Sequence, residues 1–554
     1  MQMTRLLKQL LAILIILLSQ FFVAPAGAAD PVETAQLWGR WEKSFEADTD
    51  VVPDSATGLV VRLLSPSGKR RLVPAFWDGG RIWRVRFMPD EAGRWRYRTI
   101  AFPGFPGLGE KTGSFICERV KRPENPFLRH GPVRVARAGT HLSHADGTPF
   151  FWLGDTAWNG ALLAAAGDWS EYLKDRQTKK FSVIQFVLTA PWRTAPTDAE
   201  GAVAFTGREK VRINPAFFRR MDERIDAVNQ QGLLAAPVLL WAIRGEENPG
   251  WSLPEDQAIL IGKYLVARYG AHHVVWIPAG DTTYTGENAA RWQRIGRAVF
   301  GAIPHAPVVM HPQGKQWPFE AFANEKWVDL IGYQSGHGDD NATLSWLHSG
   351  PVAAEWNRQP VRPILNLEPP YEDHIAYQSK KPISAFQVRR AAYWSLMNAP
   401  VAGLTYGAHG IWSWQTVADE PLRHKGTGIA RPWREAAQLP GSRQIMHMAN
   451  LFTALPWWEL RPAQHLVKAQ PGVGDPARFI SAMESRDGRW QVFYLPAGGE
   501  IQLTKRPTGP RAWWFDPENG LRSAAPIAQY DRFVVPENRE RALILRWSGR
   551  RGRG

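Results

Sequence analysis

The sequence predicts a multidomain chain in which a central (β/α)8 TIM barrel lies between an N-terminal β-sandwich and a small C-terminal β-domain. Three observations favour this arrangement. Short alternating strands fill residues 30–119, strand–loop–helix units fill residues 133–458, and short strands return over residues 459–548. A chain of 554 residues also exceeds what one hydrophobic core normally supports, so we expect several domains.

Residues 1–28 have the layout of a secretory signal peptide. Arg5 and Lys8 precede the apolar run Leu10–Val23, and small residues at 26–28 supply a cleavage site. The run is shorter than the ~20 residues of a membrane-spanning helix, which makes a retained anchor the less favoured alternative. We therefore expect export to the periplasm or the extracellular space, without stable membrane insertion.

The first domain is predicted from period-two alternation. The segments Leu59–Leu64, Arg81–Phe87 and Arg94–Arg98 alternate apolar and polar residues and are separated by Gly, Pro, Ser and Asp. Such spacing is typical of an antiparallel β-sandwich. A basic, proline-bearing linker over residues 120–132 leads out of it.

The middle of the chain alternates apolar strands with amphipathic helices. Apolar residues recur every three or four positions in Phe217–Val228 and Ile259–Ala267, as in helices with one buried face. The eight predicted strands are Phe151–Leu153, Val183–Leu188, Leu234–Leu240, Val274–Ile277, Pro307–Met310, Val328–Ile331, Pro363–Leu367 and Gly403–Tyr406. Eight units predict a TIM barrel. An open doubly wound sheet is the alternative, but no Gly-rich phosphate loop follows the first strand.

A last helix, Arg443–Leu455, precedes the C-terminal β-domain. Its clearest strands are Phe479–Met483, Trp490–Tyr494 and Ala542–Leu545, and a basic tail occupies residues 549–554.

The composition narrows the range of partners. The formal net charge is +15, but the arginines are spread along the chain and accompany no nucleic-acid motif. We therefore expect no nucleic-acid partner. The basic surface is expected to be merely solvated, and binding of an acidic polysaccharide is the alternative. The single cysteine, Cys117, allows no internal disulfide and is expected in a core. The 27 tryptophans suit both core packing and stacking on sugars.

In a TIM barrel the active site forms where strands end and the following loops begin. The predicted fourth strand ends in Asp281 and the seventh in Glu368. Glycoside hydrolysis uses two carboxyl groups that flank the scissile bond. Strands four and seven lie well apart around a closed eight-strand barrel, so we expect the two acids to face each other across its mouth. Each acid follows an apolar strand and should be buried. Burial and the like-charged partner would raise the pKa of one acid, as a general acid requires. A helix-capping or ion-pairing role is the alternative for either residue.

Polar and aromatic residues at the other strand ends are candidates for substrate binding. They are Asp155, Trp158, Trp192, Trp241, His311, Tyr333, His337, Tyr371, His409, Trp412 and Trp414. Asp155 could instead be a capping or positioning residue, and several tryptophans could belong to the core. The histidines lack the H-x-H or H-E-x-x-H spacing of a metal site, so we expect neither a metal nor another cofactor.

Four segments resemble the apiosidase-like glycoside hydrolase family: Asp146–Trp158, Trp276–Asp281, Asp329–His337 and Pro363–Glu372. The resemblance covers most of the chain after residue 28. The first domain is similar to the immunoglobulin-like domain often found before such barrels. The part from Pro456 onward is similar to the small β-domain that often follows them.

The resemblance implies a retaining mechanism in which Asp281 is the acid/base and Glu368 the nucleophile. Many retaining barrel glycosidases carry Asn-Glu at the end of the fourth strand, whereas this chain carries Gly280–Asp281. The apiosidase-like family accepts Asp there. We thus expect an exported hydrolase acting on a plant or microbial polysaccharide. A non-catalytic glycan- or matrix-binding protein on the same scaffold is the alternative. The sugar, the linkage, endo or exo cleavage and the oligomeric state are not predicted.

Overall fold

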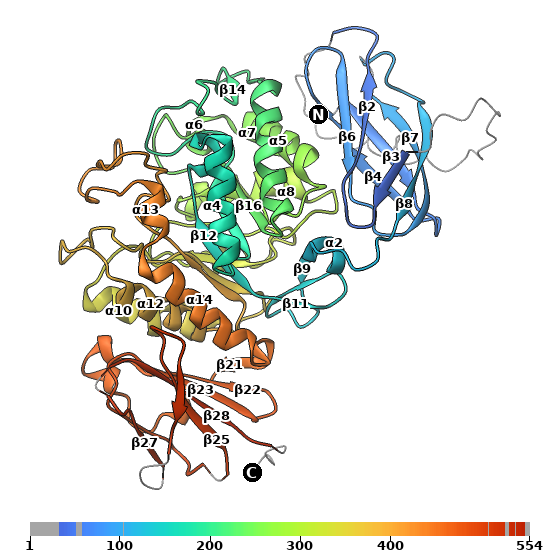
Figure 1. Cartoon of the computed structure of the whole chain (residues 1–554). Helices are drawn as coiled ribbons and strands as arrows, with labels where there is room; N and C mark the ends of the chain where they lie inside the picture. Colours follow the sequence, from blue (N-terminus) through green and yellow to red (C-terminus); the bar gives the residue numbers. More distant parts are fainter. Residues whose placement is uncertain are drawn as a thin grey trace.

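The computed structural model describes residues 33–50, 58–102, 105–507, 509–526, 531–537 and 539–548. The expected signal peptide and basic tail lie outside these ranges. Figure 1 shows a β-domain at the N-terminal end, a central α/β region, and a second β-domain at the C-terminal end. Within the described ranges, no helix is long and apolar enough to cross a membrane.

The N-terminal domain consists of two sheets over one core. One sheet has the order β1-β8-β7-β3-β4 and the other β2-β6-β5. The strands are β1 (Glu33–Gln36), β2 (Trp41–Glu46), β3 (Leu59–Leu64), β4 (Arg70–Pro74), β5 (Phe76–Trp77), β6 (Ile82–Phe87), β7 (Gly93–Ala101) and β8 (Thr112–Glu118). Trp83, Trp95 and Phe115 are fully buried between the sheets, and Cys117 is buried with them. The period-two alternation of the sequence thus places one side of each strand in this core.

A short connection leads into the central region. It contains α2 (Pro126–His130) and an antiparallel sheet of β9 (Val133–Val135), β10 (Leu142–His144) and β11 (Pro149–Phe150).

The central region is built on parallel strands. One sheet has the order β17-β16-β13-β12-β20, and β18 pairs with β19. The strands are β12 (Trp152–Thr156), β13 (Val183–Val187), β16 (Leu234–Trp241), β17 (Ile277–Gly280), β18 (Ile331–Gln334), β19 (Ile364–Glu368) and β20 (Gly403–Tyr406). Parallel bridges Trp276–Val308 and Val309–Leu330 continue the pairing from β17 towards β18. A further parallel bridge, Glu372–Ala408, links the chain beyond β19 to the chain beyond β20.

Helices follow these strands and cover them. They are α3 (Gly160–Leu163), α4 (Ala166–Thr178), α5 (Pro215–Gln230), α6 (Pro249–Ser252), α7 (Glu255–Tyr269), α8 (Gly286–Phe300), α9 (Phe319–Phe322), α10 (Asn341–Ser349), α11 (Pro351–Glu355), α12 (Ala385–Met397), α13 (Trp433–Ala437) and α14 (Pro440–Thr453). A two-stranded hairpin, β14 (Phe205–Thr206) and β15 (Arg212–Ile213), precedes α5. Every residue of β13, β16 and β19 is buried, as expected for parallel strands covered on both faces.

The C-terminal domain is antiparallel. Its main sheet has the order β21-β22-β23-β28-β25-β26, and β24 pairs with β27. The strands are β21 (Leu460–Pro462), β22 (Ser481–Ser485), β23 (Trp490–Leu495), β24 (Glu500–Gln502), β25 (Arg511–Phe515), β26 (Arg522–Ala524), β27 (Arg532–Val534) and β28 (Arg541–Arg546). Figure 1 shows α12 and α14 between this sheet and the barrel strands.

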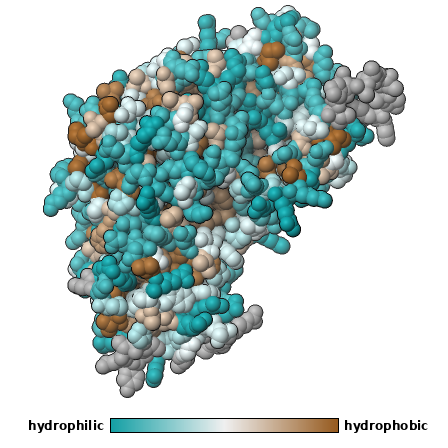
Figure 2. All heavy atoms as spheres, in the orientation of Figure 1, coloured by the Kyte–Doolittle hydropathy of each residue, from teal (hydrophilic) through white to brown (hydrophobic). Residues whose placement is uncertain are grey.

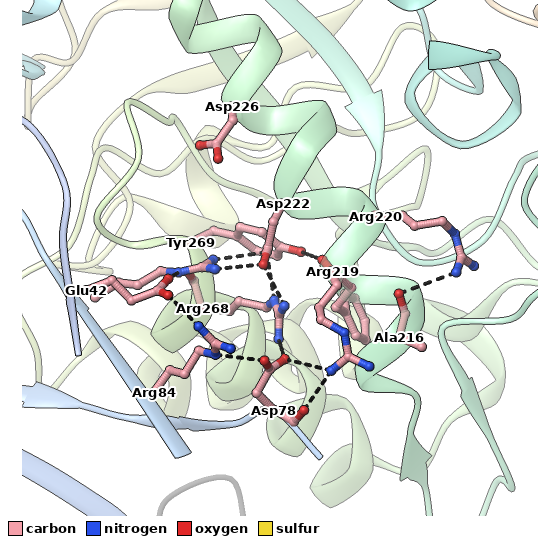
Figure 3. A network of polar contacts seen from close by, with 12 residues as sticks. Glu42, Asp78, Arg84, Ala216, Arg219, Arg220, Asp222, Asp226, Arg268 and Tyr269 are labelled. Carbon is pink, nitrogen blue, oxygen red and sulfur yellow. Dashed lines mark hydrogen bonds and ion pairs between the residues drawn. The ribbon is translucent and has the colours of Figure 1, made fainter. Parts of the chain in front are cut away.

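A buried network of charges joins the N-terminal domain to the central helices (Figure 3). Arg86 on β6 and Arg268 on α7 both donate to Asp222 on α5, at 2.7 and 2.6 Å from its Oδ2. Arg268 also donates to Asp78 at 2.8 Å, and Arg86 donates to Glu42 at 2.6 Å. Arg268 is fully buried and Arg86 nearly so. Carboxylates and guanidinium groups therefore compensate one another inside the interface.

Several elements differ from the sequence expectations. The predicted strand Pro307–Met310 forms only isolated bridges at Val308 and Val309, because Pro307 and Pro312 offer no backbone N–H for a ladder. The predicted strand Val328–Ile331 is displaced to Ile331–Gln334, which shows that apolar residues do not by themselves define where pairing begins. The helices over 217–228 and 259–267 lie within α5 and α7.

Candidate active site

Glu368 is the last residue of β19 and lies between two imidazoles. His311 Nε2 is 3.3 Å from its Oε2, and His337 Nε2 is 3.3 Å from its Oε1. The three side chains are buried, and Glu368 is only 3% exposed. Each carboxylate oxygen therefore has one imidazole nitrogen in front of it.

Backbone amides determine which imidazole nitrogens can donate. The N–H of Asp281 donates to His311 Nδ1 at 3.2 Å, and the N–H of Tyr371 donates to His337 Nδ1 at 3.3 Å. Because Nδ1 accepts in both rings, the ring hydrogen is on Nε2, which faces Glu368. His337 Nε2 thus donates to the buried carboxylate, whereas His311 Nε2 lies within ion-pair distance of it without the alignment of a hydrogen bond.

Asp281 follows β17 and has a left-handed backbone with φ of 54°. Asp tolerates this conformation better than most residues. Burial, and then the charge of Glu368, raise the pKa of Asp281 to about 7. Burial alone would also raise the pKa of Glu368, but its interactions with His311 and His337 outweigh burial and lower the pKa to about 2. One carboxyl can therefore hold a proton while the other remains ionised.

A family model for an apiosidase-like catalytic domain matches residues 136–459, and a model for a domain of unknown function, DUF5060, matches residues 34–101. The chain belongs to the apiosidase-like family of glycoside hydrolases. No curated protein matches it.

Solved structures show the same fold. A glycoside hydrolase superposes with a TM-score of 0.65 at 22% identity, covering 76% of this chain and 98% of that one. A glycoside hydrolase family 5 protein from Bacteroides vulgatus ATCC 8482 gives a TM-score of 0.66 at 22% identity, covering 76% and 94%. A third structure, from the same bacterium, covers 93% of this chain and 99% of its own at a TM-score of 0.69 and 17% identity. The central region of this apiosidase-like chain therefore has the fold of TIM-barrel hydrolases.

Four predicted tryptophans pack on one another beside the carboxylates. Trp241 lies 5.3 Å from Trp158 and 5.1 Å from Trp192, and Trp192 lies 4.9 Å from Trp412, between ring centroids. Trp158 and Trp241 also lie 5.3 and 6.0 Å from the ring of His311. These rings form one wall of the site.

Two of the indole N–H groups in this wall are satisfied and two are not. Trp158 Nε1 donates to the hydroxyl of Tyr371 at 2.8 Å. Trp412 Nε1 donates to His409 Nδ1 at 3.1 Å, and His409 Nε2 in turn donates to the carbonyl of Gly428. The indole nitrogens of Trp192 and Trp241 have no hydrogen-bond partner in the described part of the chain.

The structure places Asp155 away from this cluster. Its Oδ2 accepts from Tyr172 at 2.6 Å and from Arg176 on α4, and the residue is fully buried. Its Oδ1 accepts from the N–H of Thr156 at 3.0 Å. This is the positioning role considered as its alternative, because both oxygens of the fully buried carboxylate already have donors within the protein.

Trp414 and Tyr333 are also directed elsewhere. Trp414 stacks on Trp433 at 4.8 Å, and Tyr333 packs against Trp317 and Trp346 in a separate cluster with α9 and α11. A strand directs successive side chains to opposite faces, and the sequence alone did not determine which face Tyr333 occupies.

Loop residues that the sequence analysis missed complete the site. His374 stacks on His337 at 4.4 Å, and His424 lies 5.3 Å from Trp192. Arg193 lies over Trp192, donates to the carbonyl of Arg423, and lowers the pKa of Asp281. None of these residues ends a predicted strand, so no periodicity identified them. In the described part of the chain, no three His, Cys, Asp or Glu side chains are grouped so that they could hold a metal ion.

The loop between β20 and α13 borders the site and exposes three large apolar side chains among charged ones. Val417, Leu422 and Ile429 are 65%, 56% and 63% exposed. Figure 2 shows apolar side chains gathered where this loop lies in Figure 1. Its inner side carries His424 against the tryptophan wall.

Proposed function

We propose that this chain is a retaining glycoside hydrolase in which Asp281 is the acid/base and Glu368 the nucleophile. The observation that carries the proposal is the shared imidazole of His311, which accepts from the Asp281 amide on one side and meets Glu368 on the other. The charge of Glu368 is also a cause of the raised pKa of Asp281, which supports two carboxyl groups close enough to act on one glycosidic bond.

In the first step, Glu368 attacks the anomeric carbon and the glycosidic bond breaks. Asp281 gives its proton to the departing oxygen, and a covalent glycosyl ester forms on Glu368. In the second step, Asp281 takes a proton from water, and the water oxygen displaces Glu368. The N–H groups of His311 and His337 would also hold Glu368 when its charge returns.

The tryptophan wall supports a carbohydrate substrate. Indole rings contact the apolar faces of sugars, and the unpartnered N–H groups of Trp192 and Trp241 offer donors for hydroxyls. We infer that Trp158, Trp192, Trp241, Tyr371, His409 and Trp412, together with His311 and His337, form the substrate site. Because Asp281 and Glu368 are 9% and 3% exposed, substrate entry requires displacement of neighbouring groups, and the segment at Arg423 and His424 is the one we infer to move.

The finer features of the architecture belong to the same proposal. The parallel bridges at Val308, Val309 and Glu372 support closure of the strands into a complete (β/α)8 barrel. The two-sheet core supports an immunoglobulin-like N-terminal domain. The layout of residues 1–28 supports export to the periplasm or beyond, where a plant or microbial polysaccharide would be met.

The test is release of reducing sugar from a panel of pectic, hemicellulosic and bacterial glycans. We expect the unaltered chain to hydrolyse at least one glycan, and both Asp281→Asn and Glu368→Gln to lower its rate at least ~1000-fold, as for loss of a general acid or nucleophile. Asn is suited to the left-handed backbone at 281, so the fold should persist. Arg431→Gln is the surface control, because the ion pair that Arg431 makes among the described residues is with Asp373 at the exterior. Full activity in either carboxyl variant would remove the assignment. Binding without any hydrolysis in the panel would favour a non-catalytic glycan-binding protein.

A further inference from the structure

One face of the C-terminal sheet carries tryptophan and arginine side chains at its free end. Trp490 on β23 is in register with Arg546 on β28, and Arg546 is in register with Arg511 on β25. Two residues further along the same face lies Trp513 of β25, which is paired with Ala524 of β26. We call Trp490, Trp513, Arg511, Arg522 and Arg546 the Trp–Arg strip.

The remainder of this face is already in use. Tyr494 of β23 stacks on Tyr393 of α12 at 4.1 Å, and Val492 and Ile544 belong to the core shared with the barrel. The opposite face, with Phe493 and Leu543, forms the core of the C-terminal domain itself. The Trp–Arg strip is therefore the end of the barrel-facing side. Its half-buried tryptophans pack against the edge of the shared core, and its arginines are exposed.

The side chains of the strip hold one another in place. The rings of Trp490 and Trp513 meet edge to face at 6.2 Å between centroids. The guanidinium of Arg546 lies 4.9 Å from the Trp490 ring, and that of Arg522 lies 5.9 Å from the Trp513 ring. A guanidinium that stacks on a ring through its face keeps the N–H groups at its edge free for a ligand. Because the arginine side chain is already held in place by the ring, it loses less conformational entropy when a ligand binds.

The strip also carries uncompensated charge. Arg511, Arg522 and Arg546 are exposed, and no carboxylate of the described residues lies within ion-pair distance of them. The positions in register on this face of β22, β23, β28, β25 and β26 include no Asp or Glu. The indole N–H of Trp513 has no partner among the described residues either.

We propose that the Trp–Arg strip binds a carboxylate-bearing polysaccharide, outside the catalytic site. Planar guanidinium edges match carboxylates with two parallel hydrogen bonds, and the adjacent indoles contact sugar rings. Aromatic and arginine side chains also suit single-stranded nucleic acid. The polysaccharide is favoured because the same chain carries a catalytic domain of a glycoside hydrolase family.

The experiment uses the full chain with Glu368→Gln, so that binding is measured without cleavage. Binding of alginate, a polyuronate, is compared with binding of neutral dextran by affinity electrophoresis. Arg511→Gln combined with Arg546→Gln should weaken alginate binding at least tenfold. Arg489→Gln combined with Arg532→Gln removes the same charge from exposed arginines that pair with Asp487 and Glu500, and should change binding less than twofold. Arg546→Lys keeps the positive charge but loses the planar guanidinium that stacks on Trp490, and it should weaken alginate binding less than the double variant does.

Three results would overturn the proposal. Alginate binding no stronger than dextran binding would show that carboxylates are not recognised. Equal weakening in the two double variants would show that only net charge matters. Retention of single-stranded DNA in preference to alginate would assign the strip to another class of ligand. Circular dichroism of each variant verifies that the sheet is intact.

Discussion

At the scale of residues, Asp281 and Glu368 share one buried site but differ in the groups that surround them. Glu368 has the Nε2 atoms of His311 and His337 each at 3.3 Å, whereas Asp281 contacts His311 through its backbone amide, not its carboxyl. Burial and then the charge of Glu368 raise the pKa of Asp281 to about 7, although His311 and Arg193 oppose part of this rise. The two roles that we propose in hydrolysis rest on this difference.

The first prediction concerns the pH dependence of kcat/KM. Since Asp281 must be protonated to donate, activity should fall about tenfold per pH unit above about 7. Because the pKa of Glu368 is about 2, little loss is expected on the acid side down to pH 4. In His311→Phe, which removes the imidazole nitrogen beside Glu368 Oε2, the acid limb should move to higher pH, and His311→Gln should partly restore it. His465→Phe in the C-terminal domain is the control. An acid limb unchanged in His311→Phe would contradict the role given to the imidazole.

The second prediction concerns stability. The pKa of Asp281 is raised from 3.8 to about 7 on folding, so its ionisation opposes the folded state increasingly as pH rises above about 4, and fully above about 7. Asp281→Asn carries no such cost and should be more stable by about 2–4 kcal/mol at pH 8, with almost no difference at pH 4. Urea unfolding at the two pH values measures this. Equal stability of the two chains at pH 8 would show that Asp281 is not desolvated.

The strand-end rule predicted the carboxylates and the two histidines that contact Glu368, because barrel topology brings strand ends together whatever their separation in sequence. The rule did not determine on which face of the strand Tyr333 lies. It also did not predict that Arg176 donates to Asp155 and is buried against it. Arg193 and His424 come from loops whose course depends on tertiary packing, so sequence spacing gave no signal for them.

At the scale of elements, α5 and α7 form the contact between the barrel and the N-terminal domain. Asp222 of α5 accepts from Arg86 and Arg268, and these hydrogen bonds lower its pKa to about 2 against the effect of burial. Its contribution to stability is therefore present above its usual pKa and is lost only as pH falls towards 2.

The third prediction follows from that network. Arg268→Gln removes the fully buried guanidinium that bridges Asp78 and Asp222, and leaves Asp222 paired with Arg86. It should destabilise the protein by about 3–5 kcal/mol, as measured by urea unfolding at pH 7. Arg294→Gln removes an exposed arginine that pairs with Glu255 and Glu287, and its unfolding midpoint should stay unchanged. A midpoint equally unchanged in Arg268→Gln would mean that the domains do not depend on this contact.

The long helices were the most predictable elements, since the apolar spacing in α5 and α7 extends over several turns. The fifth predicted strand was the least predictable, because apolar residues around Val308 and Val309 indicate burial but do not determine how many ladder hydrogen bonds form between two prolines.

At the scale of the whole molecule, the two β-domains contact different helices of the barrel. β6 packs against α7, whereas β22 packs against α12, and Arg389 of α12 pairs with Glu540 beside β28. The change along the sequence from short strands to strand–helix units and back predicted three domains. It did not predict the interfaces between them. Their buried ion pairs join residues more than a hundred positions apart.

The most direct test of the roles of Asp281 and Glu368 supplies azide to the variants Asp281→Gly and Glu368→Ala during turnover of a glycoside that the unaltered chain hydrolyses. The measured quantity is the anomeric configuration of the glycosyl azide that forms. If Asp281 is the acid/base, its loss leaves the covalent intermediate to be intercepted, and the azide should have the configuration of the substrate. If Glu368 is the nucleophile, azide takes its place in the cavity and should give the opposite configuration. The reverse pattern, or inversion in both variants, would contradict the account.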